Sequence, residues 1–446
     1  MNEASDAVRG PTALILTEDT IRRDHSGVAT AIGIRVGDSC EANLELTLDP
    51  SDPFEELVRD ALERDLDAPH LHSARYRWAV DALVRRGLAL GSAVTRASPA
   101  HMDAFNQIAD AIHVVGSADL FDQAWEALLF SEDALPFSLG KPVIRVVPGA
   151  VPYLPRYQQA GSLKVAVINA RLKWSTDIPP RHVTRPLYDL ASGGNKLAIG
   201  VIAPAFPNEV EGGIVPVPGV HDPHPNAAVL HVDAHGVLLS HRQLTGRYGT
   251  ARAAFVRGSW GLEVEPYSGL KAFILINGLS ADGKLAELPI SGEELGALCR
   301  QAGTPLVVLN ACQAASSAAE GGIAVDLIKA GVPDVIAFLH QVTADSAAVF
   351  VTALYRELAR GASTAQACCS ARAALYRRGI TTAANDALLF PDWISLVHYS
   401  SSAVEPVSLP SATVDHKVEP FRPALPVPLE WALVDVQYGL YQMRCS

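Results

Sequence analysis

The feature that most constrains the fold of this chain is an alternation of apolar strand patterns with amphipathic helix patterns between residues 163 and 400. Short segments rich in Val, Ile, Leu and Ala predict buried strands at 163–170, 196–204, 226–236, 273–278, 305–312, 334–342 and 393–400. Helical patterns predict helices at 185–194, 291–303, 321–332, 343–361 and 363–379. Strands that alternate with helices join into a mostly parallel sheet flanked by helices, so the predicted fold class is α/β.

The helix predicted at 291–303 has the clearest limits. Ser291 and Glu294 have the spacing of a capping box, in which each side chain bonds the backbone N–H of the other residue. Gly303 predicts the end of the helix, because glycine readily adopts the left-handed conformation found just past a helix.

The residues before this alternation have a mixed character. Residues 12–48 predict three short strands with polar turns, and the segments 54–66, 75–90 and 102–115 have helical patterns. We therefore predict a smaller mixed α/β region at 1–124. It holds no pairing of His and Cys at strand ends, so we expect it to regulate or recruit rather than to catalyse.

The last part of the chain, 403–446, is predicted to be an arm. Its first half is rich in proline and predicts an extended segment. The segment 431–443 is amphipathic and is expected to pack back onto the body of the protein.

Composition excludes several classes of protein. Apolar residues make up 49% of the 446, enough for a substantial core, and the formal net charge of −12 disfavours broad binding to nucleic acid or anionic membranes. No apolar stretch approaches the roughly 18 residues that span a bilayer. The amino terminus lacks a signal-peptide pattern, and the six cysteines show no metal-site spacing. We expect a cytoplasmic protein with free thiols, no cofactor and no bound metal.

Cys312 stands where the predicted strand 305–312 ends and a run of small residues begins. A lone cysteine is most often a small core residue. Functional groups of open α/β sheets gather at the carboxyl ends of the strands, however, and Cys312 is placed there. A nucleophilic cysteine needs a base, so a histidine is expected at an equivalent position.

His235 is the histidine that meets this requirement among the 14 in the chain. It follows the apolar run of the strand 226–236 and precedes Gly236. Neighbouring parallel strands lie about 4.8 Å apart, so His235 as base and Cys312 as nucleophile predict a Cys/His hydrolase. The backbone N–H groups of Gly236 and Cys312 would form an oxyanion hole. His231 belongs to the strand itself and is expected to pack or support, and 237–243 is interpreted as hairpin-like.

The motifs VLHVDAHG (229–236) and LVVLNACQA (306–314) resemble those of the CHAT domain, a branch of the caspase-like cysteine peptidases of clan CD. Residues 324–375 and 392–400 are similar to the helix, Ala-Gly turn, strand and paired helices that follow, and to the closing strand. The resemblance covers roughly 125–400 and implies a caspase-like peptidase domain at 125–402. It also implies cleavage of peptide bonds through a thioester, with His235 and Cys312 as the dyad.

The resemblance further implies a substrate pocket and a biological setting. Several relatives that select basic residues or Asn have an acidic residue two positions before the cysteine, where this chain has Asn310. CHAT domains usually have an acidic residue directly after the cysteine, where this chain has Gln313. Many also have a tryptophan at the position where this chain has His340. With Leu339 and Gln341, His340 is expected to line a substrate strand by β-augmentation. A neutral or apolar residue is therefore expected before the cut.

Bacterial proteases of this family are often linked to defence and regulated cell death, where they cut a specific protein such as a gasdermin. The resemblance thus implies a protein substrate and an activating protein partner. Two alternatives remain open from the residues. One is a caspase-like scaffold or regulatory module without activity, and the other is a Cys hydrolase of small amides.

Overall fold

The structure is a computed structural model. It describes residues 13–24, 27–36, 41–48, 73–97, 111–116, 121, 124–131, 134–155, 162–171, 181–215, 227–280, 283–311, 322–340, 342–378, 380–381, 387–388 and 391–401.

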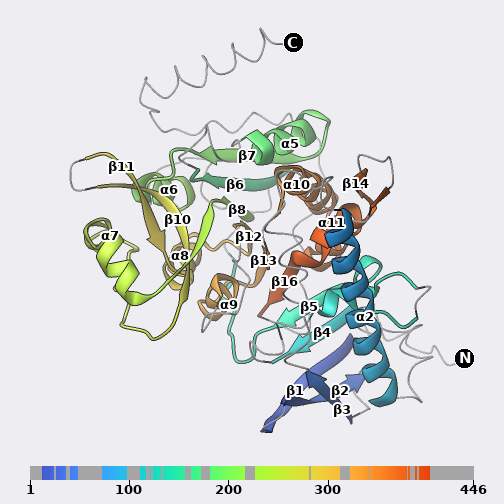
Figure 1. Ribbon diagram of the computed structural model, residues 1–446. Coiled ribbons are helices and arrows are strands. Elements are labelled where there is room, and N and C mark those ends of the chain that lie inside the picture. The colour runs from blue at the N-terminus through green and yellow to red at the C-terminus, as the bar shows by residue number, and fades with distance from the viewer. Residues whose placement is uncertain are drawn as a thin grey trace, which may run out of the picture.

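Among the described residues, eleven strands form one sheet that runs the length of the molecule (Figure 1). In spatial order the strands are β3 (Glu41–Leu48), β2 (Gly27–Val36), β1 (Ala13–Asp24), β4 (Ala111–Val115), β5 (Val143–Val146), β16 (Leu396–Ser400), β13 (Asp334–Phe338), β12 (Leu306–Asn310), β8 (Val229–Asp233), β6 (Leu163–Asn169) and β7 (Leu197–Ile202). Pairing is antiparallel at β1–β2, β2–β3 and β13–β16 and parallel at the other junctions. The predicted α/β class with a mostly parallel sheet is confirmed.

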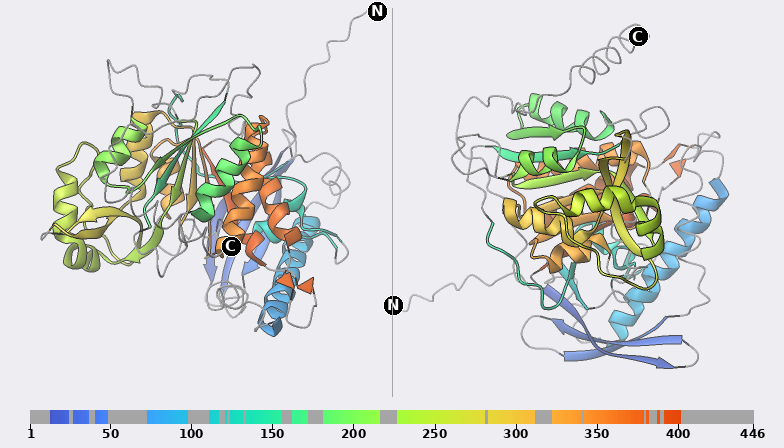
Figure 2. Two further views of the ribbon diagram at one scale, coloured as in Figure 1. Left: turned by 90° about the horizontal axis from the view of Figure 1, so that it is seen from above. Right: turned by 90° about the vertical axis from the view of Figure 1, so that its left-hand side faces the viewer.

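Helices cover both faces of this sheet (Figures 1 and 2). The helices are α2 (Ser73–Ala97), α5 (Arg181–Ser192), α6 (Pro207–Ile214), α7 (His241–Val256), α8 (Gly292–Ala302), α9 (Ile323–Lys329), α10 (Ala344–Ala359) and α11 (Thr364–Arg378). One apolar core lies between the sheet and α6, α8 and α9, and a second lies between the sheet and α5, α10 and α11. Because both faces are covered, β8, β12 and β13 are buried along their whole length, as their apolar runs predict.

A smaller sheet stands beside the large one. It consists of β9 (His235–Leu239), β10 (Lys271–Leu279) and β11 (Leu285–Ile290), with β10 in the middle. Together with α7 it forms a satellite core around Leu239, Tyr248 and Phe273 (left side of Figure 1). The short elements are β14 (Ile380–Thr381), β15 (Ala387–Leu388) and the 3₁₀ helices η3 (Trp125–Ala127), η4 (Phe137–Leu139) and η5 (Pro391–Ser395).

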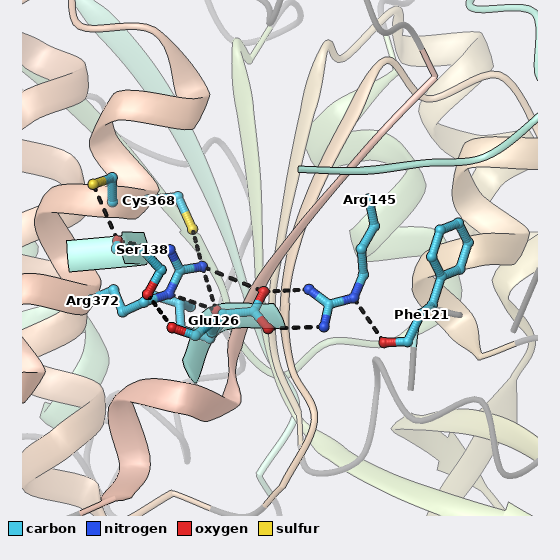
Figure 3. A network of polar contacts seen from close by, with 8 residues as sticks. Phe121, Glu126, Ser138, Arg145, Cys368 and Arg372 are labelled. Atoms are coloured by element: carbon cyan, nitrogen blue, oxygen red, sulfur yellow. Dashed lines mark hydrogen bonds and ion pairs between the residues drawn. The ribbon is translucent and has the colours of Figure 1, made fainter. Parts of the chain in front are cut away.

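A buried ion network joins segments that are far apart in the sequence (Figure 3). Glu126 of η3 and Arg145 of β5 are both fully buried and form a two-fold ion pair, in which Nη2 donates to Oε2 at 2.9 Å. The Arg145 Nε donates to the backbone oxygen of Phe121 at 2.9 Å. Arg372 of α11 lies with its Nη2 3.8 Å from Oε1 of Glu126, and its Nη1 donates to the backbone oxygen of Ser138 at 3.2 Å.

The predicted element limits hold in several places. The three strands expected at 12–48 are β1, β2 and β3, and the helix expected at 75–90 lies within α2. The capping box of Ser291 and Glu294 is present, and Gly303 ends α8 with a φ of 71°. The predictions at 54–66, 102–110 and 402–446 lie outside the described residues.

Two predictions are wrong. The helix expected at 102–115 is a strand from 111 to 115, because β4 pairs in parallel with both β1 and β5 and its β-branched residues suit that position. The hairpin expected at 237–243 does not form. Residues 235–239 pair with β10 instead, and Ser240 begins α7 with a capping box that includes Gln243.

The expected domain boundary at 124/125 stays a prediction, and it falls between the paired strands β4 and β5.

Candidate functional site

The two strands that precede the candidate dyad are neighbours. β8 and β12 pair in parallel, and their last residues, Asp233 and Asn310, are register partners. His235 lies two residues beyond Asp233, and Cys312 lies two residues beyond Asn310. The expectation that the two strand ends lie side by side is confirmed, while the side chain of Cys312 is outside the described residues.

Backbone hydrogen bonds hold these strand ends together past the last ladder pair. The N–H of Ala234 donates to the oxygen of Asn310 at 3.4 Å, and the N–H of Ala170 donates to the oxygen of Asp233 at 3.0 Å. The second bond adds the end of β6 to the group. Three neighbouring strands therefore end at one level, at the carboxyl edge where α/β proteins place their functional groups.

His235 lies at the point where the chain leaves the large sheet. It is the first residue of β9 and pairs with Leu275 of β10, and Gly236 pairs with Ile274. Both residues are half-buried. The strand that carries the imidazole follows β8 directly in the chain and pairs with β10. The covalent link to β8 and the pairing with β10 both constrain the backbone of His235, while part of the residue stays exposed.

Sequence reasoning missed a buried ion pair directly beneath this point. Asp233 is fully buried, and its Oδ1 accepts hydrogen bonds from Nε of Arg171 at 2.8 Å and from Nδ2 of Asn310 at 3.0 Å. Arg171 follows β6 and is 6% exposed, and its backbone N–H donates to Oδ1 of Asn169 at 3.4 Å. The available signal was the aspartate in VLHVDAHG, a charge in an otherwise apolar strand pattern, which must find a partner when buried.

The expected substrate-binding residues are only partly described. Asn310 is 4% exposed, and its Nδ2 donates a hydrogen bond to Oδ1 of Asp233. Leu339 and His340 follow β13 and are half-buried, while Gln313 and Gln341 lie outside the described residues. The backbone N–H of Leu339 donates to the oxygen of Ser395 at 2.8 Å, so this particular N–H already has an acceptor within the protein. The substrate pocket expected around these residues stays a prediction.

His231 is a core histidine rather than a second base. It is fully buried, and its Nδ1 lies 2.9 Å from the hydroxyl of Tyr355 on α10. Burial lowers the pKa of His231 to about 3, so the ring is neutral at physiological pH. This outcome matches the supporting role expected for it.

The described cysteines are poor nucleophiles. Cys299, Cys368 and Cys369 are buried free thiols. Burial raises the pKa of Cys299 and of Cys368 to about 12 and also raises the pKa of Cys369. Because the thiolate is the reactive form, these three side chains are unsuited to acyl transfer at neutral pH. Cys40, Cys312 and Cys445 lie outside the described residues.

Metal sites and membrane-spanning helices are absent from the described residues. Within the described ranges, no group of three or more His, Cys, Asp or Glu side chains is arranged to hold a metal ion. Over the same residues, no helix has both the length and the apolar character that crossing a membrane requires.

Comparison with known proteins found a family match and structural similarities. Residues 217–413 match the CHAT domain family, and this range includes both His235 and Cys312. A crystal structure of the Saccharomyces cerevisiae separase–securin complex is similar, with 11% identity, a TM-score of 0.34 and coverage of 78% of this chain and 22% of that chain. A second structure of that complex has 11% identity, a TM-score of 0.32 and coverage of 79% and 22%. This chain thus spans about a fifth of the length of those chains. No curated protein matched it.

Proposed function

We propose that this protein is a caspase-like cysteine endopeptidase in which His235 is the general base and Cys312 the nucleophile, because residues 217–413 match the CHAT domain family. The observation that carries the proposal is the register of Asp233 with Asn310. The two candidate residues follow these partners at the same distance along the chain. This spacing supports a pairing of base and thiol of the kind that nucleophilic catalysis uses.

The proposed reaction proceeds in two stages. In the first, the His235 imidazole takes the proton of the Cys312 thiol, and the sulfur attacks the peptide carbonyl carbon. The resulting oxyanion accepts hydrogen bonds from the backbone N–H groups of Gly236 and Cys312. The C–N bond then breaks, the imidazolium returns the proton to the leaving amine, and a thioester remains. In the second stage, His235 takes a proton from water as the water oxygen attacks the thioester carbonyl carbon. The C–S bond then breaks, which releases the new carboxyl group, and His235 returns the proton to the sulfur of Cys312.

We propose a protein, rather than a small amide, as the substrate. This choice rests on the CHAT domain and on the expected substrate strand around Leu339 and His340. A pore-forming protein of the gasdermin type, cut during defence or regulated cell death after activation by a protein partner, is the more specific proposal. It rests on the family resemblance alone.

Proteome-wide sequencing of new amino termini tests the function. Wild-type protein, Cys312→Ala and His235→Ala are each incubated with a lysate of the source cells and with purified products of neighbouring genes. We expect amino termini that wild type creates and that neither variant creates, clustered in one or a few proteins. Single-residue variants are the matched controls because they share every other surface with wild type.

Other outcomes would favour the alternatives. Termini that appear equally with Cys312→Ala would come from a contaminating protease and would overturn the assignment. If wild type creates no new termini and its Cys312 reacts with iodoacetamide no faster than free cysteine, a scaffold role would be favoured. If peptides stay intact while small amides are hydrolysed through Cys312, the enzyme would be an amidase.

A further inference from the structure

We propose that Arg171 and Asp233 are positioning residues for the dyad. Their buried ion pair, extended by Asn310, fixes the relative placement of the strand ends that lead to His235 and to Cys312. The inference rests on the proposed function, since it concerns the geometry of the same two residues. It adds Arg171, which follows a third strand, β6, and which no motif of the sequence indicates.

The contacts place one carboxylate at the junction of three strands. Asp233 stands in register with Asn169 of β6 on one side and with Asn310 of β12 on the other. Its Oδ1 accepts from Arg171 at 2.8 Å and from Asn310 at 3.0 Å. These bonds act at and just beyond the last register pairs of the three strands, where the chain leaves the sheet.

The environment makes this ion pair sensitive to geometry. The side chains of Arg171 and Asp233 are 4% and 0% exposed. Removing two charges from water costs free energy that their attraction repays only with good geometry and further hydrogen bonds, so a buried ion pair is weak support for stability. A pair of this kind does, however, penalise any displacement of one strand end against the others, because a displaced charge would remain buried without its partner. The expected consequence is a fixed separation between the two strand ends that lead to the dyad residues.

The end of β6 is itself held in place. Asn277 of β10 donates from Nδ2 to the oxygen of Ala170 at 3.3 Å, and its Oδ1 accepts from the N–H of Ala205 at 2.5 Å. β10 also pairs with β9, the strand that begins with His235. The ion pair therefore closes a loop of contacts that runs from β6 through β10 and β9 to β8.

Alkylation of Cys312 by iodoacetamide measures the placement of the dyad without a known substrate. The thiolate sulfur displaces iodide, and mass spectrometry of the Cys312 peptide gives the rate separately from the other cysteines. A correctly placed His235 increases the thiolate fraction near neutral pH, so the rate and its pH profile report the pairing. The full-length chain is used throughout, and each rate is divided by the folded fraction.

The variants separate positioning from stability. Arg171→Met is expected to slow alkylation at pH 7 by about tenfold or more, since small misplacements at an active site are costly. Arg145→Met breaks the buried pair with Glu126, three strands away from β12, and should leave the rate per folded molecule within about twofold. Asn310→Ala removes one hydrogen bond to Asp233 without leaving a charge, and it keeps the test open if Arg171→Met does not fold.

Rescue provides the decisive comparison. The double variant Arg171→Met/Asp233→Asn removes both charges while keeping an acceptor for Asn310, so its rate should recover to within about threefold of wild type. Equal rates in wild type, Arg171→Met and Asn310→Ala would overturn the inference, as would additive losses in the double variant. Failure of the proposed function has a different signature, because His235→Ala would then alkylate at the wild-type rate and with the wild-type pH profile.

Discussion

At the residue scale, His235 and Cys312 are the side chains on which the proposed chemistry depends. We predict that Cys312→Ala and His235→Ala each reduce cleavage by about a thousandfold or more, because a nucleophile and its base act as a unit. His235 is half-buried, so its truncation should change the melting temperature by only about 2 °C. Cleavage of the first site found in the lysate and circular dichroism measure the two effects. If either variant keeps more than about a tenth of wild-type activity, the dyad is misassigned.

The residue before the cut is expected to be neutral or apolar. Asn310 is neutral, and the nearby carboxylate of Asp233 already accepts from Arg171 and Asn310. A basic substrate side chain would have to compete with a buried guanidinium for that carboxylate, which is unfavourable. Reporter peptides that end in Leu, Asn, Asp or Arg should show turnover of Leu or Asn at least about tenfold above Arg. Fastest turnover of the Arg reporter would contradict the prediction and would indicate a second carboxylate.

The difference between what was and was not predictable at the site has a physical basis. His235 and Gly236 were predictable because a polar residue and a glycine after an apolar run form a local pattern. The partner of Asp233 was not, because Arg171 lies 62 positions earlier and the pair forms only when β6 is the neighbour of β8. Alternation of strands and helices predicts a parallel sheet but does not determine strand order.

At the scale of elements, the Glu126 network is expected to hold η3, β5 and α11 together. Glu126→Gln would remove the only negative charge that Figure 3 shows between Arg145 and Arg372, so two buried guanidinium groups would face each other. We predict a loss of about 3–5 kcal/mol in the free energy of unfolding, measured by urea denaturation. Glu357→Gln is the matched control, because its ion pair with Arg360 is exposed and should contribute under about 1 kcal/mol. Similar losses in both variants would show that burial does not set the contribution of Glu126.

The contact between α8 and α9 is predicted to depend on pH. Asp326 of α9 is 6% exposed and its Oδ2 has no hydrogen-bond partner. Burial, together with the nearby charge of Glu293, raises the pKa of Asp326 to about 7. In the unfolded chain the pKa is about 4, so between these values the folded state binds more protons and stability falls as pH rises from about 4 to about 7. Above that range this carboxyl causes no further loss.

Asp326→Asn is the variant that tests this dependence. The amide cannot ionise, so its free energy of unfolding relative to wild type should rise by about 2–3 kcal/mol between pH 5 and pH 8. Urea denaturation at the two pH values gives this difference, and Asp345→Asn serves as a control at a more exposed carboxyl in the first turn of α10. An Asp326→Asn effect that is equal at both pH values would mean that the carboxyl ionises normally.

Element predictions failed where local pattern and tertiary pairing disagree. Residues 111–115 are five positions long, and such a short apolar run fits the end of a helix as well as a strand. Its parallel partners, β1 and β5, lie about 100 positions before it and about 30 after it, so no local signal identifies them. The capping box of α8 was predictable because all its contacts lie within four residues.

At the scale of the whole molecule, the predicted amino-terminal region and the residues that match the CHAT domain family contribute strands to one sheet. The strand β4 pairs with β5 in parallel, and α2 packs on the segment of chain between these two strands. Gly87 and Gly91 of α2 show how close this packing is, because a Cβ at either position would lie within 2.0 Å of a backbone oxygen of the segment 127–129. A regulatory role for 1–124 would therefore act through a region that is also part of the core.

Truncation is expected to show this dependence. A chain that starts at Trp125 loses Leu90, Val94, Ile112 and Val114 from the main core, along with the other core residues of α2 and β4. Each large apolar side chain contributes about 1.5–3 kcal/mol on burial, so the loss approaches about 10 kcal/mol. Domains of this kind have only about 5–15 kcal/mol in total. We predict that the truncated chain shows no cooperative urea transition and no cleavage, whereas removal of residues 1–12 alone leaves both intact. A cooperative transition with reporter cleavage by the shorter chain would instead establish 125–402 as an independent peptidase domain and leave 1–124 free to regulate it.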